Sequence, residues 1–259
     1  MTTRDVRIDR RYRGPERSGN GGYTAGLVGT ALATAARAAA DAGSGSAEAT
    51  DSAPGVPQVT LRLPPPLDTD LALTASADRA RLLTADETVV AEAVAVDADI
   101  LANAAIDPLP YDEARAAEAR YRGMRDHPFP GCYACGPDNP AGLRLRPGFV
   151  GDGRTACTWT PGAGLAEADE LVGAVHLWAA LDCPGGWSID LEGRPSVLGQ
   201  MTACVDARPH PGEPCVIMGR HLGESGRKTF TASTLYDADG RILARARHTW
   251  ITVDPSLFN

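Results

Sequence analysis

The chain has 259 residues, enough for one large domain or for two domains of about 100–150 residues each. Its 25 basic and 33 acidic residues give a formal net charge of -8, which argues against general nucleic-acid binding because phosphate neutralisation needs surplus Lys and Arg. No apolar run is long enough for a membrane span, and the N-terminal residues lack the apolar core of a signal peptide. We therefore expect a cytoplasmic protein without nucleic-acid or membrane partners, whose six cysteines are thiols.

The first half of the chain reads as strands around one helix. A polar strand is expected at residues 6–13, followed by the Gly-rich turn 18–23 and an Ala-rich helix from about Tyr23 to Ala40. Residues 40–57 are rich in Ala, Gly, Ser and Asp without an apolar period, which predicts a flexible surface loop. Further strands are expected at 59–63, 71–74, 79–84 and 88–96.

The second half repeats this order. It shows a strand pattern at 154–160, a helix pattern at 170–182, and strand patterns at 197–207, 215–221, 228–235 and 241–253. Each half is then a strand, a helix and a four-strand meander, whose sheet can curl around its apolar helix. We expect an N-terminal unit at 1–106, a linker at 107–131 and a C-terminal unit at 132–259. Two such units can join their edge strands into one continuous antiparallel sheet around two helices, an α+β fold.

The turn before the first helix is the first candidate site. Asn20, Gly21 and Gly22 stand where free backbone N–H groups point towards partial negative charge. The N–H groups of Gly22 and Tyr23 could polarise a thioester carbonyl, which becomes an oxyanion during acyl transfer. The simpler alternative is a tight turn in which Asn20 only caps the helix.

The second helix carries a carboxylate in an apolar setting. Asp182 ends this helix and is the best candidate for a general base or a nucleophile, whereas the corresponding part of the first helix has Gly29. The alternative is an exposed or capping Asp182. We also assign His176 and Trp178 to substrate binding, with Trp178 lining an acyl tunnel between helix and sheet.

A third cluster has the spacing of metal ligands. Two residues separate Cys132 from Cys135, and His127 could add a ligand. The remaining cysteines are scattered and form no second pair, so we expect a tight loop with buried thiols and no metal.

The segment Cys132-Tyr-Ala-Cys-Gly-Pro-Asp-Asn-Pro-Ala-Gly-Leu143 looks like the entry motif of the phenylacetyl-CoA thioesterase-type hotdog proteins. The helix that ends in Asp182 resembles their catalytic helix, and the repeated order of elements is similar to that of an actinobacterial double-hotdog group. The resemblance implies that Asn20 stands in the position of their His, with Gly21 and Gly22 as the glycine pair, Asp182 as the carboxylate and Asn139 as the motif Asn.

The resemblance implies a thioester hydrolase that acts on acyl-CoA or an acyl carrier, at a composite site between the two hotdog halves. Coenzyme A would enter only as part of the substrate, no other cofactor is expected, and a homodimer or higher homo-oligomer is expected. The predicted catalytic residues are Asp182, Asn20, Gly21 and Gly22, and the predicted substrate-binding residues are Tyr23, Asn139, His176 and Trp178.

Two other functions stay open at this stage. One is a non-catalytic acyl-CoA-binding hotdog protein, since Asn20 replaces the family's His. The other is a hotdog dehydratase or hydratase, because the segment from His127 to Gly131 resembles the His-Phe-Pro-Gly of those enzymes. Their carboxylate on a following helix is missing, because the loop after Gly131 is expected to run into a strand. The acyl chain is not specified by the sequence.

Overall fold

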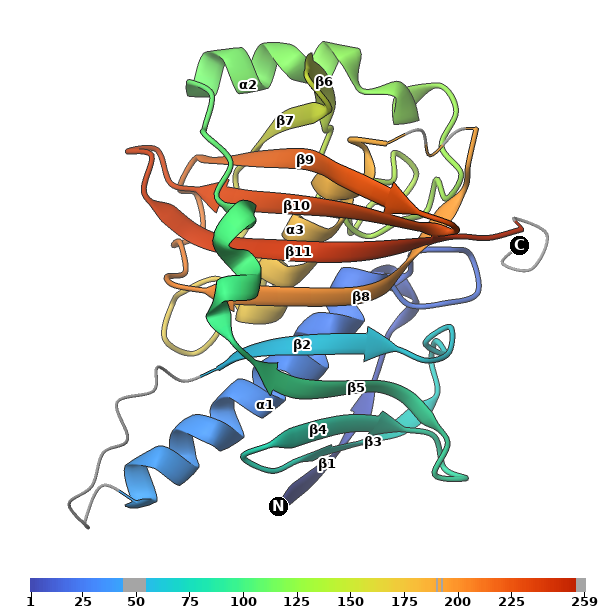
Figure 1. Ribbon diagram of the computed structural model, residues 1–259, viewed down its shortest axis with the longest axis vertical. Coiled ribbons are helices and arrows are strands. Elements are labelled where there is room, and N and C mark those ends of the chain that lie inside the picture. The colour runs from blue at the N-terminus through green and yellow to red at the C-terminus, as the bar shows by residue number, and fades with distance from the viewer. Residues whose placement is uncertain (44–54, 190, 192, 255–259) are drawn as a thin grey trace.

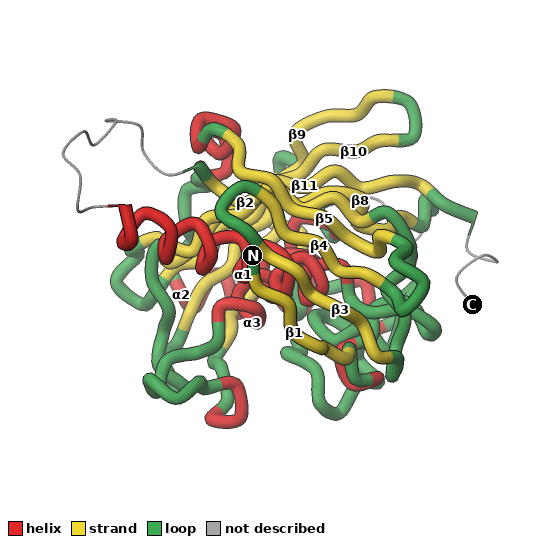
Figure 2. Tube along the Cα trace, turned by 90° about the horizontal axis from the view of Figure 1, so that it is seen from below, coloured by secondary structure: helices red, strands yellow, loops and turns green. Residues whose placement is uncertain are grey.

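The computed structural model describes residues 1–43, 55–189, 191 and 193–254. Its strands form a single antiparallel sheet that arches over two helices, α1 (Gly21–Gly43) and α3 (Ala174–Gly186) (Figures 1 and 2). The two helices pack against each other on the inner side of the sheet. None of the helices within the described ranges has the length and apolar character needed to cross a bilayer.

The two halves of the sheet have matching strand orders. The order is β1-β3-β4-β5-β2 in the first half and β8-β11-β10-β9-β7 in the second, with β6 at the outer edge. The halves join where β2 pairs antiparallel with β8 and Val59 lies opposite Met201. The first-half strands are β1 (Thr2–Arg7), β2 (Val56–Leu61), β3 (Asp70–Ala75), β4 (Arg79–Leu83) and β5 (Val89–Val96). The others are β6 (Gly148–Gly151), β7 (Arg154–Trp159), β8 (Ser196–Val205), β9 (Cys215–Ser225), β10 (Lys228–Tyr236) and β11 (Ile242–Thr252).

The predicted four-strand meander is wrong in one respect. In each half only three strands form a meander, and the strand that follows the helix pairs with the last strand of that meander: β2 with β5, and β8 with β11. This strand occupies the centre of the sheet, where it also pairs with the other half. The alternation of apolar and polar residues indicates which residues form strands but not which strands are neighbours. The sequence therefore could not reveal this order.

The element boundaries also differ at several points. The strand expected at 6–13 is β1 at Thr2–Arg7, and Arg10–Tyr12 form a 3-10 turn capped by the side chain of Asp9. Helix α3 begins at Ala174 rather than 170 and continues past Asp182 through Pro184 to Gly186. In the predicted loop 40–57, α1 extends to Gly43 and β2 begins at Val56, while residues 44–54 lie outside the described residues.

The segment expected to link the halves is partly helical. It contains α2 (Tyr111–Ala117) and short 3-10 turns at Glu118–Arg120 and Arg122–Met124, and it lies beside β6 and β7 (Figure 1). Two further 3-10 segments are Ala98–Ala104 and Ala163–Leu165. The division into units at 1–106 and 132–259 stays a prediction.

Glycines on α1 allow the two central helices to approach closely. A Cβ on Gly26 would lie 2.9 Å from Cβ of Trp178, and one on Gly29 would lie 2.7 Å from the Trp178 ring. Any larger residue at these positions would push the helices apart, since real Cβ atoms do not approach other heavy atoms this closely. This crossing brings the start of α1 against the later turns of α3, and so it positions the candidate site.

Candidate active site

Asp182 on α3 faces the Gly-rich turn at the start of α1. Its Oδ2 accepts hydrogen bonds from Nδ2 of Asn20 at 2.9 Å and from the backbone N–H of Gly22 at 3.0 Å. Asp182 and Asn20 are each 2% exposed. Within the described part of the chain, Oδ1 of Asp182 has no hydrogen-bond partner. The two halves therefore share one buried carboxylate with one satisfied and one unsatisfied oxygen.

The buried setting changes the acidity of this carboxyl group. Desolvation by burial, followed by the nearby Cys132 sulfur, raises the pKa of Asp182 to about 7, against the lowering effect of the Gly22 N–H and the Asn20 amide. Burial disfavours the charged form, whereas donors to the charged form favour it. A carboxyl group in this range exchanges its proton near neutral pH.

Among the described residues this arrangement occurs once. Asp182 is the ninth residue of α3, and the ninth residue of α1 is Gly29, which packs on the Trp178 ring. The start of α3 has Gly173 as its N-cap, with no side-chain cap hydrogen bond, in place of Asn20. The symmetry-related position therefore lacks both the carboxylate and the amide that supports it.

The predicted oxyanion donors need a correction. The N–H of Gly22 binds Asp182, and the N–H of Tyr23 donates to Oδ1 of Asn20 at 2.8 Å, so neither is available to a substrate. Of the three consecutive N–H groups at the start of α1, only that of Gly21 has no acceptor among the described residues. As the first residue of the helix, Gly21 has no intrahelical acceptor for its N–H.

Asn20, Gly21 and Asp182 lie on the wall of a cavity of about 250 Å³. The cavity is bounded by the start of α1, the end of α3, and the ends of β2 and β8 near the join of the two halves. Much of its wall is apolar, including Leu61, Leu63, Phe129, Trp187, Leu198 and Trp250. An apolar chain therefore fits this space, with its polar end directed at Asp182 and Gly21.

Arg144, Arg146 and Arg194 of the second half do not lie on the wall of the main cavity. Arg144 and Arg146 line a separate small cavity, and Arg194 pairs with Glu224 at 3.0 Å. Among the described residues, Arg62 is the only arginine on the wall of the main cavity. Its Nη2 lies 2.7 Å from Oε1 of Glu92.

Two predicted substrate-binding residues belong to an aromatic cluster instead of the cavity wall. Tyr23 stacks on Tyr12 with ring centroids 4.0 Å apart, and Tyr133 meets both rings edge-on. Nδ1 of His176 lies 2.9 Å from the Tyr133 hydroxyl, and burial lowers the pKa of His176 to about 4.

The other two predicted substrate-binding residues hold the scaffold together. Nδ2 of Asn139 donates to the carbonyls of Arg11 at 2.8 Å and Gly131 at 2.9 Å. These bonds tie the loop of residues 132–143, the motif loop, to the first half. Trp178 is 3% exposed and lies between α1 and α3. Neither side chain lies on the wall of the main cavity.

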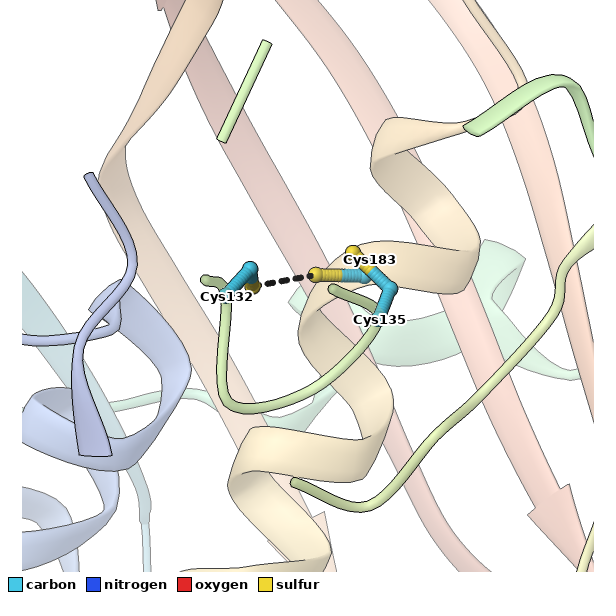
Figure 3. A group of neighbouring side chains, drawn as sticks. All are labelled: Cys132, Cys135 and Cys183. Carbon is cyan, nitrogen blue, oxygen red and sulfur yellow. Dashed lines mark hydrogen bonds between the residues drawn. The ribbon is translucent and has the colours of Figure 1, made fainter. Parts of the chain in front are cut away.

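The cavity wall also carries residues that the sequence did not place there. His127, Cys132, Cys135 and Cys183 line it beside Asp182. The three sulfur atoms lie within 4.8 Å of one another, although Cys183 comes from α3 and the other two from the motif loop (Figure 3). The spacing of Cys132 and Cys135 signalled part of this group, but nothing in the sequence indicated that Cys183 joins it.

No protein-family model matches the chain, and no curated protein sequence is significantly similar to it. Solved structures do match it over nearly its whole length. The tesB protein of Mycobacterium avium subs paratuberculosis has a TM-score of 0.60 at 12% identity, over 97% of this chain and 93% of that one. A candidate thioesterase from Novosphingobium aromaticivorans DSM 12444 has a TM-score of 0.60 at 15% identity, over 97% and 96%.

A candidate oleoyl thioesterase from Lactobacillus plantarum also matches, with a TM-score of 0.54 at 11% identity over 97% of this chain and 96% of that one. In each case the alignment covers nearly all of both chains, so the likeness extends over both halves of this fold. At these identities the likeness concerns the fold alone. The chain therefore has the double-hotdog fold.

Proposed function

We propose that this protein hydrolyses an acyl thioester at a composite site formed by Asn20 and Gly21 of the first half and Asp182 of the second. The observation that carries the proposal is the buried Asp182 carboxylate, held by Asn20 and Gly22 on an apolar cavity wall. It lies beside the Gly21 N–H, which has no acceptor among the described residues. A base, an oxyanion donor and an acyl pocket are the parts that thioester hydrolysis needs.

In the proposed reaction Asp182 acts as a general base through Oδ1. A water molecule attacks the thioester carbonyl carbon while its proton passes to Oδ1, and the carbonyl oxygen becomes an oxyanion. The tetrahedral intermediate collapses with cleavage of the C–S bond, and the departing thiolate takes the proton from Asp182. The products are a carboxylic acid and a thiol, and the carboxylate returns to its ionised form.

The neighbouring groups have distinct roles in this scheme. The Gly21 N–H donates to the oxyanion, an interaction that contributes on the order of 3 kcal/mol to the transition state. Asn20 and the Gly22 N–H position Asp182 by holding Oδ2, and Oδ1, which has no hydrogen-bond partner among the described residues, remains to accept the proton of the water. Direct attack by Oδ1 would use the same geometry but would pass through a mixed anhydride. The base role is supported by the tight fixation of the carboxylate.

The proposed substrate is an acyl-CoA or an acyl-carrier thioester, with its acyl chain in the apolar cavity. Hydrolysis consumes only water, so coenzyme A enters as part of the substrate and the proposed reaction uses no other cofactor. The free thiols of all six cysteines suit a reducing cytoplasm, and this location and a homo-oligomeric state stay predictions. Light scattering after gel filtration would measure the oligomeric state.

A panel of acyl-CoAs of increasing chain length tests the proposal, with free coenzyme A detected by chromatography. The Asp182→Asn variant keeps the shape of the side chain but removes the base, and we expect turnover to fall by about 10²–10⁴-fold. Asp70→Asn is the matched control, because Asp70 pairs with Arg7 at the surface with 85% of its side chain exposed.

Two results would contradict thioester hydrolysis. Binding of acyl-CoA without any release of coenzyme A by the unaltered protein would indicate a non-catalytic acyl-binding protein. Hydration of enoyl-CoA without thioester cleavage would indicate a hydratase, for which His127 on the same cavity wall would be the partner of Asp182.

A further inference from the structure

The three-cysteine cluster has the dimensions of a metal site. Sγ of Cys132 lies 3.7 Å from Sγ of Cys183, and all three sulfurs lie within 4.8 Å of one another (Figure 3). Tetrahedral zinc with Zn–S bonds of about 2.3 Å separates its sulfur ligands by about 3.8 Å. Small adjustments of the side chains would therefore bring the three sulfurs around one ion.

The backbone holds the cysteines in this arrangement. The N–H of Gly136 donates to the carbonyl of Cys132 at 2.8 Å, which closes a tight turn around the two loop cysteines. A Cβ on Gly136 would lie 2.3 Å from the Pro130 carbonyl oxygen, so the turn requires glycine. Cys183 directly follows Asp182 on α3 and is fixed by the helix. The cluster is thus preformed.

Several N–H groups surround the sulfurs. Nε1 of Trp187 donates to Sγ of Cys135 at 3.3 Å, and Nδ2 of Asn20 donates to Sγ of Cys132 at 3.6 Å. Such donors stabilise thiolates and are typical of the groups that surround metal-bound sulfur. Thiols that pack only as small apolar groups need no donors.

His127 supports the cluster from outside. Its Nδ1 accepts a hydrogen bond from the N–H of Phe129 at 2.9 Å, so in the neutral ring the proton is on Nε2. Nε2 lies 3.3 Å from Sγ of Cys135 and donates to it in this tautomer. The fourth position of a tetrahedral ion would then be open to the cavity, where a water molecule can bind.

We propose that Cys132, Cys135 and Cys183 bind a zinc ion through three thiolates, with the fourth position facing the cavity that Asp182 lines. Soft thiolate ligands favour zinc among the common divalent ions. The ion would join the motif loop to α3 next to Asp182. This site goes beyond the proposed hydrolysis, which uses neither the cysteines nor a metal.

Zinc analysis tests the proposal without an activity assay. The full chain is expressed in zinc-supplemented medium without a polyhistidine tag, purified in reducing buffer and measured by inductively coupled plasma mass spectrometry. We expect one zinc ion per chain, and X-ray absorption at the zinc edge should show three sulfur neighbours at about 2.3 Å and one lighter atom. Cobalt exchanged into the site should give the intense thiolate charge-transfer band of tetrahedral Co²⁺.

Variants locate the ion. Cys183→Ser should lose the bound zinc, whereas Cys204→Ala should retain it, because Cys204 lies on β8 outside the cluster. His127→Gln should weaken zinc binding by about 10–100-fold. A metal-free unaltered protein, zinc retained in full by Cys183→Ser, or a disulfide between two of the three cysteines in reducing buffer would overturn the proposal. The measurement on the unaltered chain decides the matter even if a variant misfolds.

Discussion

Replacing Gly22 with alanine perturbs the point where the two halves meet around Asp182. The new Cβ would lie 2.5 Å from Cβ of Asp182 and 2.8 Å from the carbonyl oxygen of Trp178. Normal carbon contacts are about 3.5–4.0 Å, so α3 must retreat by roughly 1 Å. Overpacking of this kind costs about 1–3 kcal/mol, which lowers the melting temperature of a chain of this size by roughly 2–12 °C.

The same displacement would move the carboxylate relative to the Gly21 N–H. A misplacement of about 1 Å costs on the order of 100-fold in rate when reacting groups must be aligned. Acyl-CoA turnover and differential scanning calorimetry measure the two effects in parallel. Gly164→Ala is the matched control, since its Cβ would meet no atom within 4 Å. If Gly22→Ala matched the unaltered protein in both rate and melting temperature, the close contact between Gly22 and Asp182 would be refuted.

Three more predictions address the supporting interactions. Asn20→Ala removes the amide bound to Asp182 and the cap on the Tyr23 N–H. The free energy of unfolding measured in urea should therefore fall by about 1–3 kcal/mol, and turnover should fall as well. An unchanged unfolding curve would contradict this. Burial lowers the pKa of His248 to about 3 in the folded chain. As the pH falls, this histidine is therefore protonated in the unfolded chain before it is protonated in the folded chain. The histidine should therefore lower stability by roughly 1.4 kcal/mol per pH unit from about pH 6 to pH 4, and His248→Gln should remove this part of the slope. Removal of zinc by a chelator in reducing buffer should lower the melting temperature, with the same shift in Cys204→Ala and no shift in Cys183→Ser.

The sequence predicted most strands because alternation of buried and exposed residues survives in them. β11 alternates in this way, whereas most of β10 is buried without alternation, and both lie within two residues of their predicted bounds. The first strand was misplaced because five of its six residues are exposed and carry no alternation. The order of strands depends on long-range pairing, such as that of Val59 with Met201, which no local pattern encodes.

Part of the candidate site could likewise be predicted from the sequence, and part of it could not. Duplication of the elements indicated that the turn at Asn20 and the end of the second helix face each other, and the structure places Asn20 and Asp182 at hydrogen-bond distance. Which N–H stays free could not be predicted, because it depends on whether the Asp182 and Asn20 side chains accept from Gly22 and Tyr23. The contact of Cys183 with the two loop cysteines could not be predicted either, because it requires the loop to dock against α3.

A crystal structure with a non-hydrolysable thioester analogue, in which a methylene replaces the sulfur, tests the central claim most directly. The account predicts that the acyl chain occupies the apolar cavity and that the carbonyl oxygen accepts from the Gly21 N–H at about 2.7–3.1 Å. Oδ1 of Asp182 should face the carbonyl carbon through one water molecule. A carbonyl bound at the cluster of Tyr12, Tyr133 and His176, away from Asp182, would contradict the composite site.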